Sequence, residues 1–250
     1  MQSSDAILRV ENASRRFGGL TAVNKVNLTL HAGEIRALIG PNGAGKTSLF
    51  NLVTGVLKCS SGRIQFKGQE ISHLPSYRRF KLGIGRSFQI VNLFTDLTVE
   101  ENVRLGVQAA LKHATHPMEW VSPRAIEWKT REIFDQYKWF KNPLAKAGSL
   151  IYAEQKKLET LMALTSNPDL LLLDEPTAGI DENDIKIMVD MIRSSSVNRT
   201  VLLTDHDTRF VMAIADRISV LDQGAIIAEG TPEEVAENPK VEEVYFGGGH

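Results

Sequence analysis

The chain has 250 residues, of which 42% are hydrophobic and 24% charged, and this composition is ordinary for a globular protein and argues against disorder. Its formal net charge of −1 argues against a general attraction for nucleic acid. Its single cysteine, Cys59, excludes an internal disulfide and fits a reducing compartment, where we expect a partly buried thiol without a functional role. No signal peptide is recognisable and no apolar run approaches the ~20 residues of a membrane helix, so we expect other chains to supply any membrane-spanning part.

The N-terminal part of the chain is predicted to form short strands and one helix. Apolar and polar residues alternate at 7–10 and 26–30, which is typical of half-buried strands, and residues 34–39 form a more continuous apolar run. The next segments are a glycine-rich turn, a helix, and a strand followed by a turn, at residues 40–46, 47–55 and 62–68.

Residues 98–163 differ from the rest of the chain and predict a helical insertion. Apolar residues recur at helical spacing from Val99 to Leu111 and again from Ile126 to Phe140. All three tryptophans lie in this stretch, at Trp120, Trp128 and Trp139. Because aromatic residues at helical spacing usually belong to a core, we expect them to be buried, with a docking surface as the alternative.

Strand and helix patterns alternate in the C-terminal part. The four leucines at 170–173 lie between Pro168 and Asp174 and predict a strand covered on both faces. After them we expect two helices and three strands in the order helix, strand, helix, strand, strand, at residues 181–193, 200–204, 208–215, 218–221 and 225–228. Such alternation predicts a largely parallel sheet with helices on both sides.

A phosphate-binding sequence separates the strand at 34–39 from the helix at 47–55. It reads Gly40-Pro41-Asn42-Gly43-Ala44-Gly45-Lys46-Thr47 and fits the pattern G-x-x-x-x-G-K-[ST]. Glycines let successive backbone N–H groups turn toward a polyanion, and the helix N-terminus adds partial positive charge. We expect Lys46 to bridge the β- and γ-phosphates of a bound nucleotide and so to take part in catalysis, and we expect the Thr47 hydroxyl to ligate Mg²⁺. The alternative is a glycine-rich turn that matches by chance.

Two acidic residues follow the four-leucine strand directly. Asp174 and Glu175 lie where the strand ends, and open α/β sheets bind ligands at that edge. We expect Asp174 to hold the Mg²⁺ hydration shell and Glu175 to orient the attacking water or accept its proton. Taken alone, a strand that ends in a solvated acidic turn explains these residues equally well.

With both motifs in place, the chain resembles the ABC transporter ATPases over nearly all of its length. The resemblance implies that Phe17 stacks on adenine, that Gln89 senses Mg²⁺ and water and contacts the membrane subunit, and that His206 acts in catalysis at the γ-phosphate. Asp181 falls where family members communicate across a dimer, and a helix N-cap is an equally good interpretation. Further nucleotide contacts are implied at Val23, Asn42, Gly43, Ala44, Gly45, Lys46, Thr47 and Ser48.

This resemblance also implies the architecture and the partners. We expect an α/β P-loop NTPase (RecA-like) core, at 1–97 and 164–250, with an N-terminal antiparallel β subdomain and an inserted α-helical subdomain at 98–163. The implied cofactors are ATP and Mg²⁺. The implied partners are a second ATPase subunit, identical or different, membrane-spanning permease subunits and indirectly a solute-binding protein, with no nucleic acid. The chain would lie peripherally on the cytoplasmic face of the inner or plasma membrane.

Several segments are similar to the ATPases of branched-chain amino-acid importers in particular. They are the stretches at 83–89, 93–94 and 97–103 and the C-terminal stretches at 228–232 and 244–247. Importers of urea, amides or other polar solutes share much of this pattern, so they remain alternatives. A nucleotide-binding structural subunit with low turnover is a further alternative.

One segment departs from the family. Where relatives carry L-S-G-G-Q or L-S-Y-G-[ED]-Q, this chain has the signature segment Leu150-Ile151-Tyr152-Ala153-Glu154-Gln155. In the family this segment caps the γ-phosphate held by the partner subunit. Ile151 has no hydroxyl to donate, and a charge-assisted hydrogen bond of that kind contributes roughly 1.5–3 kcal/mol. Ala153 adds a Cβ and would cost ~1 kcal/mol if its backbone had a positive φ.

Two interpretations of this departure remain open. The segment is either a variant that works well enough, or the mark of an asymmetric heterodimer. In the second case this chain's phosphate-binding sequence, Glu175 and His206 form a competent site, and its altered signature segment leaves the partner's site slow.

Overall fold

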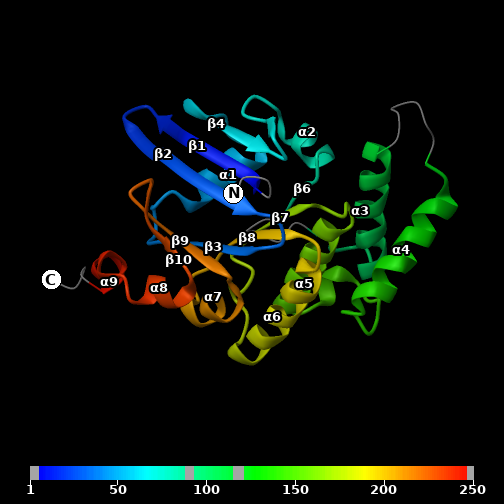
Figure 1. Ribbon diagram of the computed structural model, residues 1–250. Helices are drawn as coiled ribbons and strands as arrows, with labels where there is room; N and C mark the ends of the chain where they lie inside the picture. The colour runs from blue at the N-terminus through cyan, green and yellow to red at the C-terminus, as the bar shows by residue number, and fades with distance from the viewer. Residues whose placement is uncertain (1–5, 88–92, 115–120, 247–250) are drawn as a thin grey trace.

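The computed structural model describes residues 6–87, 93–114 and 121–246. Two sheets form its centre (Figure 1): a four-stranded sheet of order β2-β1-β4-β5 and a six-stranded sheet of order β10-β9-β3-β8-β7-β6. The six-stranded sheet is the core of an α/β fold of the P-loop NTPase type. This arrangement confirms the predicted fold class.

The four-stranded sheet is antiparallel, and its first two strands are longer than the sequence predicted. They are β1 (Ala6–Phe17), β2 (Leu20–His31), β4 (Ser61–Phe66) and β5 (Gln69–Glu70). The register between β1 and β2 shifts between Val10 and Ala13, and Asn12 between them has a φ of 48°. Such irregularities interrupt the two-residue alternation, which is why the prediction stopped at residue 10.

The six-stranded sheet is parallel except for its last hairpin. Its strands are β3 (Ile35–Ile39), β6 (Ile84–Arg86), β7 (Leu170–Asp174), β8 (Thr200–Thr204), β9 (Arg217–Asp222) and β10 (Ala225–Gly230). Only β9 and β10 pair antiparallel. Every residue of β3, β7 and β8 is buried, as the continuous apolar runs predicted. The three-residue β6 was not predicted because it is too short to show a period.

Two hydrophobic cores cover the opposite faces of this sheet. One core contains α1 (Lys46–Thr54) and the antiparallel sheet, and the other contains α6 (Glu182–Ser196) and α7 (Thr208–Ile214). Leu170 and Leu172 belong to the first core, whereas Leu171 and Leu173 belong to the second. The strand therefore needs leucine at every position. The sequence did not predict three short helices, which are α2 (Ser76–Lys81), α8 (Pro232–Ala236) and α9 (Pro239–Phe246).

The helical insertion contains α3 (Val99–Ala114), α4 (Pro123–Tyr137), a short 3₁₀ turn at Ala147–Ser149 and α5 (Tyr152–Leu164). In Figure 1 α3 and α4 stand at one end of the molecule, and α5 packs against α3 as well as against β6 and β7. The helix α5 therefore contacts both the insertion and the six-stranded sheet, and it ends at Leu164, one residue beyond the expected boundary at 163. No helix in the described part of the chain is long and apolar enough to cross a bilayer.

The tryptophans of this insertion do not share one environment. Trp139 packs on the hydrophobic core, with its ring centroid 4.8 Å from that of Tyr137. Trp128 is 67% exposed, so the expectation that it belongs to the core was wrong. It lies on the outer face of α4. Helical spacing places a residue on one face of a helix, but it does not reveal whether another element covers that face. Trp120 lies outside the described residues.

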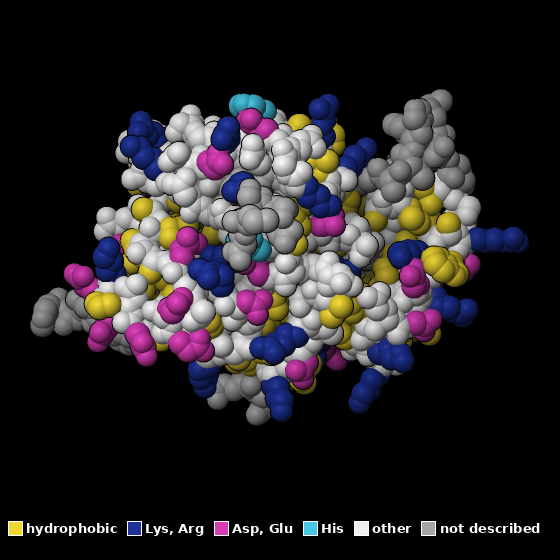
Figure 2. All heavy atoms as spheres, viewed as in Figure 1, with side chains coloured by type: hydrophobic (Ala, Val, Ile, Leu, Met, Phe, Trp, Pro, Cys, Tyr) yellow, Lys and Arg dark blue, Asp and Glu magenta, His cyan; other side chains and the backbone are white. Residues whose placement is uncertain are grey.

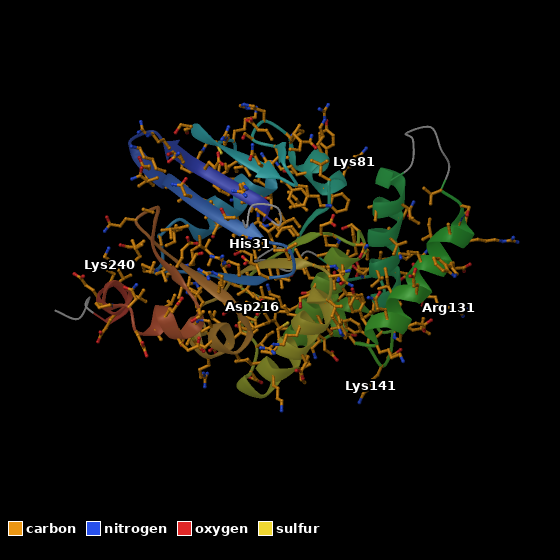
Figure 3. The ribbon with its side chains drawn as sticks, viewed as in Figure 1. His31, Lys81, Arg131, Lys141, Asp216 and Lys240 are labelled. Atoms are coloured by element: carbon orange, nitrogen blue, oxygen red, sulfur yellow. The ribbon has the colours of Figure 1, made fainter. Side chains whose placement is uncertain are left out.

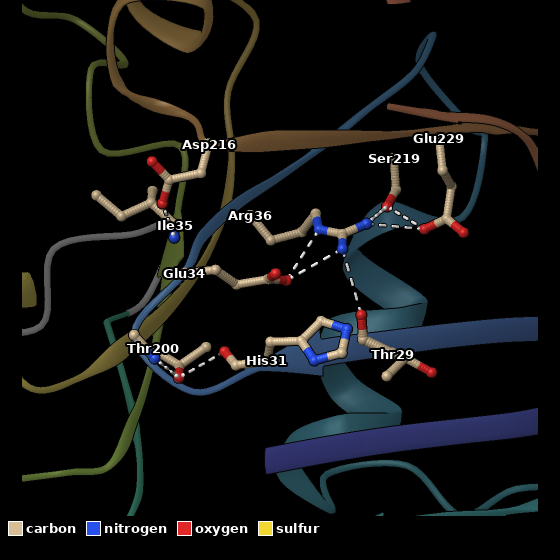
Figure 4. Close-up of polar contacts among 10 residues, drawn as sticks. Thr29, His31, Glu34, Ile35, Arg36, Thr200, Asp216, Ser219 and Glu229 are labelled. Atoms are coloured by element: carbon tan, nitrogen blue, oxygen red, sulfur yellow. Dashed lines mark hydrogen bonds and ion pairs between the residues drawn. The ribbon is translucent and has the colours of Figure 1, made fainter. Parts of the chain in front are cut away.

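A buried arginine joins the two sheets. Arg36 on β3 is 3% exposed, and its guanidinium donates to the Glu229 carboxylate at 2.9 Å and the Ser219 hydroxyl at 3.0 Å (Figure 4). It also donates to the Glu34 carboxylate at 3.1 Å and to the backbone carbonyl of Thr29 at 3.3 Å. These partners lie on or beside β2, β3, β9 and β10, so one cation links the antiparallel sheet to the edge of the parallel sheet.

Other charged side chains lie mostly at the periphery. Figure 3 shows Arg131 and Lys141 at the outer edge of the helical insertion and Lys240 on α9, while Asp216 lies near the centre of the view. The Asp216 carboxylate accepts the backbone N–H of Ile35 at 2.7 Å, which fixes the start of β3. On the face in Figure 2, basic and acidic side chains are interspersed, and acidic ones gather over α8 and α9.

We expect Arg36→Met to lower the free energy of unfolding by about 2 kcal/mol, because the buried Arg36 side chain would lose its charge-assisted hydrogen bonds to Glu34 and to the more exposed Glu229. Urea denaturation followed by circular dichroism measures this change. Arg63→Met is the matched control, since Arg63 pairs with Glu11 on the exposed surface and should matter far less. Equal effects of the two substitutions would contradict a linking role for Arg36.

Candidate functional site

A cavity of about 720 Å³ lies at the carboxyl ends of the parallel strands. Glu175 and His206 reach it from the ends of β7 and β8, and a long stretch of backbone from Asn42 to Ser48 forms one side. The remaining lining residues are Phe17, Leu20, Thr21, Ala22 and Gln223. Residues from five separate parts of the sequence thus meet at one edge of the sheet.

The glycine-rich loop at 40–46 has the backbone that its glycines predict. Gly40, Gly43 and Gly45 have φ values of 154°, 81° and 106°. A Cβ at Gly40 would lie 2.0 Å from the Leu221 carbonyl oxygen, and one at Gly45 would lie 2.2 Å from that of Ala22. Side chains are therefore excluded at both positions. The loop leads directly into the N-terminus of α1, an arrangement that binds phosphate groups.

Lys46 lies at the start of α1 and is mostly buried. Its ammonium group donates to the backbone carbonyls of Gly40 at 2.6 Å and Pro41 at 3.1 Å. Burial lowers the pKa of Lys46, while the negative charges of Glu175 and Asp174 act in the opposite direction. The two carboxylates thus help to keep a charged ammonium group beside the loop.

The other end of α1 is fixed by a second buried arginine. Arg79 is 1% exposed and donates to the backbone carbonyls of Leu52 at 2.5 Å and Val53 at 2.8 Å. Burial lowers the pKa of Arg79 to about 10. A cation at the C-terminus of a helix complements its dipole, so Arg79 holds α1 in place while the opposite end faces the cavity.

Asp174 is the last residue of β7, directly before Glu175, and is 2% exposed. One carboxylate oxygen accepts the Thr204 hydroxyl at 2.9 Å, and the other accepts the Arg86 guanidinium at 2.9 Å. Together with the Thr47 hydroxyl, this is an oxygen donor set that suits Mg²⁺. Among the described residues no group of three or more His, Cys, Asp or Glu side chains could hold a metal ion.

Glu175 has a strained backbone that is held from the neighbouring strand. Its φ is 50°, an uncommon value for a residue with a side chain, and its N–H donates to the Thr204 carbonyl at 2.9 Å. The His206 imidazole Nε2 lies 2.9 Å from a Glu175 carboxylate oxygen. The two predicted catalytic side chains therefore contact each other at the rim of the cavity.

Asp205 orients this pair and was not singled out from the sequence. It is 5% exposed, and its carboxylate accepts the Thr177 hydroxyl at 2.7 Å and the backbone N–H groups of Thr177, His206 and Asp207 at 3.0, 2.7 and 3.0 Å. It thereby ties the loop after Glu175 to the loop that carries His206. Its position between the end of β8 and His206 could have indicated a site residue in the sequence. An acidic residue after a strand is, however, too common to predict a role by itself.

The edge of the cavity next to β1 and β2 is aromatic. Phe17 is 43% exposed and lines the cavity, and the Arg15 guanidinium lies 4.6 Å from the centroid of its ring. Phe17 is thus not a core residue. Val23 does not line this cavity. It is fully buried in the hydrophobic core because it lies on the inward face of β2.

Asp181 does not line this cavity either, and one further predicted residue is not described. Gln89 lies outside the described residues. Asp181 occupies the N-cap position of α6 with extended backbone, but its side chain makes no capping hydrogen bond. The position supports the N-cap interpretation, and the capping bond that would accompany it is not formed.

The signature segment lies at the start of α5 and is not part of this cavity. Ile151 occupies the N-cap position with φ −65° and ψ 158°, is 64% exposed and provides no side-chain cap. Serine is among the best residues at such a position and isoleucine among the worst. The Gln155 amide donates back to the Leu150 carbonyl at 3.1 Å. The loss of serine therefore affects the helix as well as any ligand.

Ala153 lies inside the first turn of α5 and is 6% exposed. Its backbone is right-handed helical, so the expected cost of a positive φ does not arise here. Alanine is in fact a better helix former than glycine by about 1 kcal/mol. Tyr152 lies beside it, and its ring is in close contact with Gly179, where an added Cβ would lie 2.9 Å from a ring carbon.

Several known proteins are similar in sequence to this chain. Sequence profiles for "ABC transporter" and for "branched-chain amino acid ATP-binding cassette transporter" match residues 23–178 and 225–250. The high-affinity branched-chain amino acid transport ATP-binding protein LivG of Escherichia coli K12 is 37% identical over 252 residues, covering 98% of this chain and 99% of the relative. BraF of Pseudomonas aeruginosa, which has the same description, is 36% identical over 269 residues with the same coverage. The lipopolysaccharide export system ATP-binding protein LptB of Haemophilus influenzae is 35% identical, covering 97% and 98%.

Solved structures agree with the sequence matches. The ADP conformation of MJ1267, an ATP-binding cassette of an ABC transporter, has a TM-score of 0.85 and 30% sequence identity, covering 97% of this chain and 99% of that one. A nucleotide-free ATP-binding cassette from an ABC transporter has a TM-score of 0.84 and 29% identity, covering 96% of this chain and 98% of that one. The whole of this chain therefore aligns with proteins of similar length and similar fold.

We expect Ile151→Ser to raise the free energy of unfolding by about 1 kcal/mol, because the serine hydroxyl can accept a free N–H group in the first turn of α5. Ala153→Gly is the matched counterpart and should lower it by about 1 kcal/mol through loss of helix propensity. Thermal or urea unfolding without nucleotide measures both effects. A destabilising Ile151→Ser would show that Ile151 makes a packing contact worth more than the cap.

Proposed function

The chain belongs to the ABC transporter family of ATP-binding proteins, and from this premise we propose that it hydrolyses ATP to power a membrane importer of branched-chain or other amino acids. One observation carries the proposal: the phosphate-binding loop, the acidic end of β7 and His206 surround a single cavity in a chain that aligns end to end with LivG and BraF. The match of residues 225–250 to the branched-chain amino acid profile supports the substrate class.

In the proposed mechanism the loop binds the triphosphate through its backbone N–H groups, the N-terminus of α1 and the ammonium group of Lys46. Phe17 offers an exposed ring for the adenine at the opposite end of the cavity. Thr47 and Asp174 would hold Mg²⁺, which neutralises charge on the β- and γ-phosphates when bound. Each group thus meets the part of the nucleotide that its chemistry fits.

Glu175 and His206 are the residues we propose for the chemical step. Glu175 orients the attacking water and accepts its proton, and its strained backbone aims the carboxylate into the cavity. His206 contacts Glu175 at 2.9 Å and is about half exposed, so it can also reach a terminal phosphate. Asp205 keeps both loops in register. Two of the contacts that these roles require are already formed: Glu175 contacts His206, and Asp205 accepts hydrogen bonds from both loops.

The proposed assembly contains further chains. A second ATPase subunit would face the cavity with its own signature segment, and permease subunits would span the membrane while this chain lies on the cytoplasmic face. A solute-binding protein would deliver the amino acid without touching this chain.

An ATPase for urea, amides or other polar solutes is the alternative for the same assembly, because the ATPase does not contact the solute. The 35% identity to LptB shows that similar chains also carry the description of an export ATPase.

The signature segment favours an asymmetric form of this assembly. The loop, Glu175 and His206 are intact, whereas Ile151 places an exposed apolar side chain where relatives have a hydroxyl. We therefore propose a heterodimer in which this chain's own site hydrolyses ATP and the partner's site, completed by Ile151 and Ala153, is slow. A nucleotide-binding subunit with low turnover is the alternative.

Glu175→Gln should leave ATP affinity within a few fold of the wild type and lower turnover by about 10²–10⁴-fold, because the amide cannot accept the proton. Nucleotide binding and phosphate release, measured on the assembled transporter, separate the two quantities. Glu242→Gln is a suitable control, since this glutamate is exposed on α9 away from the cavity. Normal turnover in Glu175→Gln would remove Glu175 from the chemical step.

The double substitution Ile151→Ser with Ala153→Gly tests the asymmetric assembly. It should raise ATP turnover of the assembled transporter by up to about twofold, because a second competent site would act beside the first. The matched comparison is Ile151→Ser alone, which restores the helix cap and the hydroxyl but keeps the alanine Cβ. If turnover does not rise in the double variant, the altered segment does not limit the partner's site.

A further inference from the structure

Arg86 is a partly buried cation at the site, and the proposed mechanism gives it no role. It is the last residue of β6, next to β7 in the sheet, and its side chain is 11% exposed. The Arg86 guanidinium lies 5.9 Å from the centroid of the Phe50 ring on α1. Neither the phosphate-binding pattern nor the acidic pair in the sequence points to it.

The Arg86 guanidinium links the two elements that form the site. One terminal nitrogen donates to the Asp174 carboxylate at 2.9 Å. The other donates to the Asn51 side-chain oxygen at 2.6 Å and lies 3.3 Å from the Thr54 hydroxyl, both on α1. The helix that begins in the phosphate-binding loop and the strand that ends in Asp174 therefore share one cation.

This cation pairs with the carboxylate that we place beside Mg²⁺. Asp174 is 2% exposed, so its charge needs compensation within the protein, and Arg86 provides it directly. Removing one partner of a buried ion pair leaves an uncompensated charge. A divalent cation held by Asp174 would also compensate this charge, and it would be repelled by the Arg86 charge.

We propose that Arg86 is a positioning residue that acts as a built-in counter-ion for Asp174 and thereby weakens the affinity of the site for Mg²⁺. The proposal rests on the proposed ATP and Mg²⁺ site. Arg86 keeps the buried carboxylate neutralised and correctly placed when no metal is bound, and the metal must then bind against its charge. Without this residue, Mg²⁺ would bind more tightly.

A purely orienting role for Arg86 predicts the opposite sign. Side chains that only orient a metal-binding group typically strengthen binding, and their loss costs about 10–100-fold in metal affinity. Asp174 is also held by the Thr204 hydroxyl and by full burial of β7, so its placement does not depend on Arg86 alone. For that reason the repulsion between Arg86 and Mg²⁺ should change the Mg²⁺ affinity more than the orienting hydrogen bond to Asp174 does.

The test is a series of Arg86 variants of the full chain in saturating AMP-PNP, with the melting temperature measured against buffered free Mg²⁺. Arg86→Met should lower the Mg²⁺ concentration for half-maximal stabilisation by about tenfold, because one unit of positive charge near the metal is lost. Arg86→Lys, which keeps the charge with a different geometry, should stay within about twofold of the wild type. An unchanged or higher half-saturating concentration in Arg86→Met would overturn the proposal.

Two further variants keep the test decisive. Arg86→Gln removes the charge but keeps hydrogen-bond donors, so it replaces Arg86→Met if the latter does not fold, and it should shift in the same direction. Thr204→Val removes an orienting bond without changing charge and should raise the half-saturating Mg²⁺ or leave it unchanged. A decrease in Thr204→Val equal to that in Arg86→Met would show that loosening of Asp174, and not charge, is responsible.

The same experiment separates this proposal from the proposed function. If the wild type gains no stability from AMP-PNP at any Mg²⁺ concentration, the ATP site itself is wrong. If the wild type is stabilised by Mg²⁺ and AMP-PNP while Arg86→Met and Arg86→Gln match it, only the role of Arg86 is refuted.

Discussion

The carboxyl ends of β3, β7 and β8 lie at one edge of a parallel sheet, and the proposed catalytic machinery depends on that alignment. β3 leads into the glycine loop, β7 into Asp174 and Glu175, and β8 into Asp205 and His206. Because every residue of these strands is buried, a shift of one strand by a single residue would turn apolar side chains into the wrong core. The register that the two cores fix therefore also fixes the geometry of the site.

Charge compensation is the second constraint on this edge. Lys46 is mostly buried near two carboxylates, Asp174 is paired with Arg86, and Asp205 is surrounded by donors from two loops. Few of these groups face free solvent, so each polar atom depends on a fixed neighbour. A site built in this way is already organised before a ligand arrives, and a bound cation or phosphate must replace or oppose contacts that exist.

The signature segment shows how one sequence change acts at two levels. Ile151 removes a hydroxyl that relatives could use toward a nucleotide, and it also removes the natural cap of α5. Ala153, which looks like a second defect in the sequence, stabilises the helix because its backbone is right-handed. The packing of Tyr152 on Gly179 places this segment against the loop between β7 and α6. An effect of the segment on turnover therefore has to be separated from an effect on the stability of α5.

The sequence by itself determined the parallel core, the helical insertion, the phosphate-binding loop and the pair Asp174 and Glu175, because these depend on local patterns: continuous apolar runs, helical spacing and glycine placement. Tertiary structure decided the rest. Bulges lengthened β1 beyond its alternating pattern, an unpartnered face left Trp128 exposed, and the inward side of β2 took Val23 away from the cavity. Arg86 and Asp205 became parts of the site only because strands distant in sequence lie side by side. A buried hydrogen bond between such strands leaves no periodic mark in the chain, so only the folded arrangement reveals it.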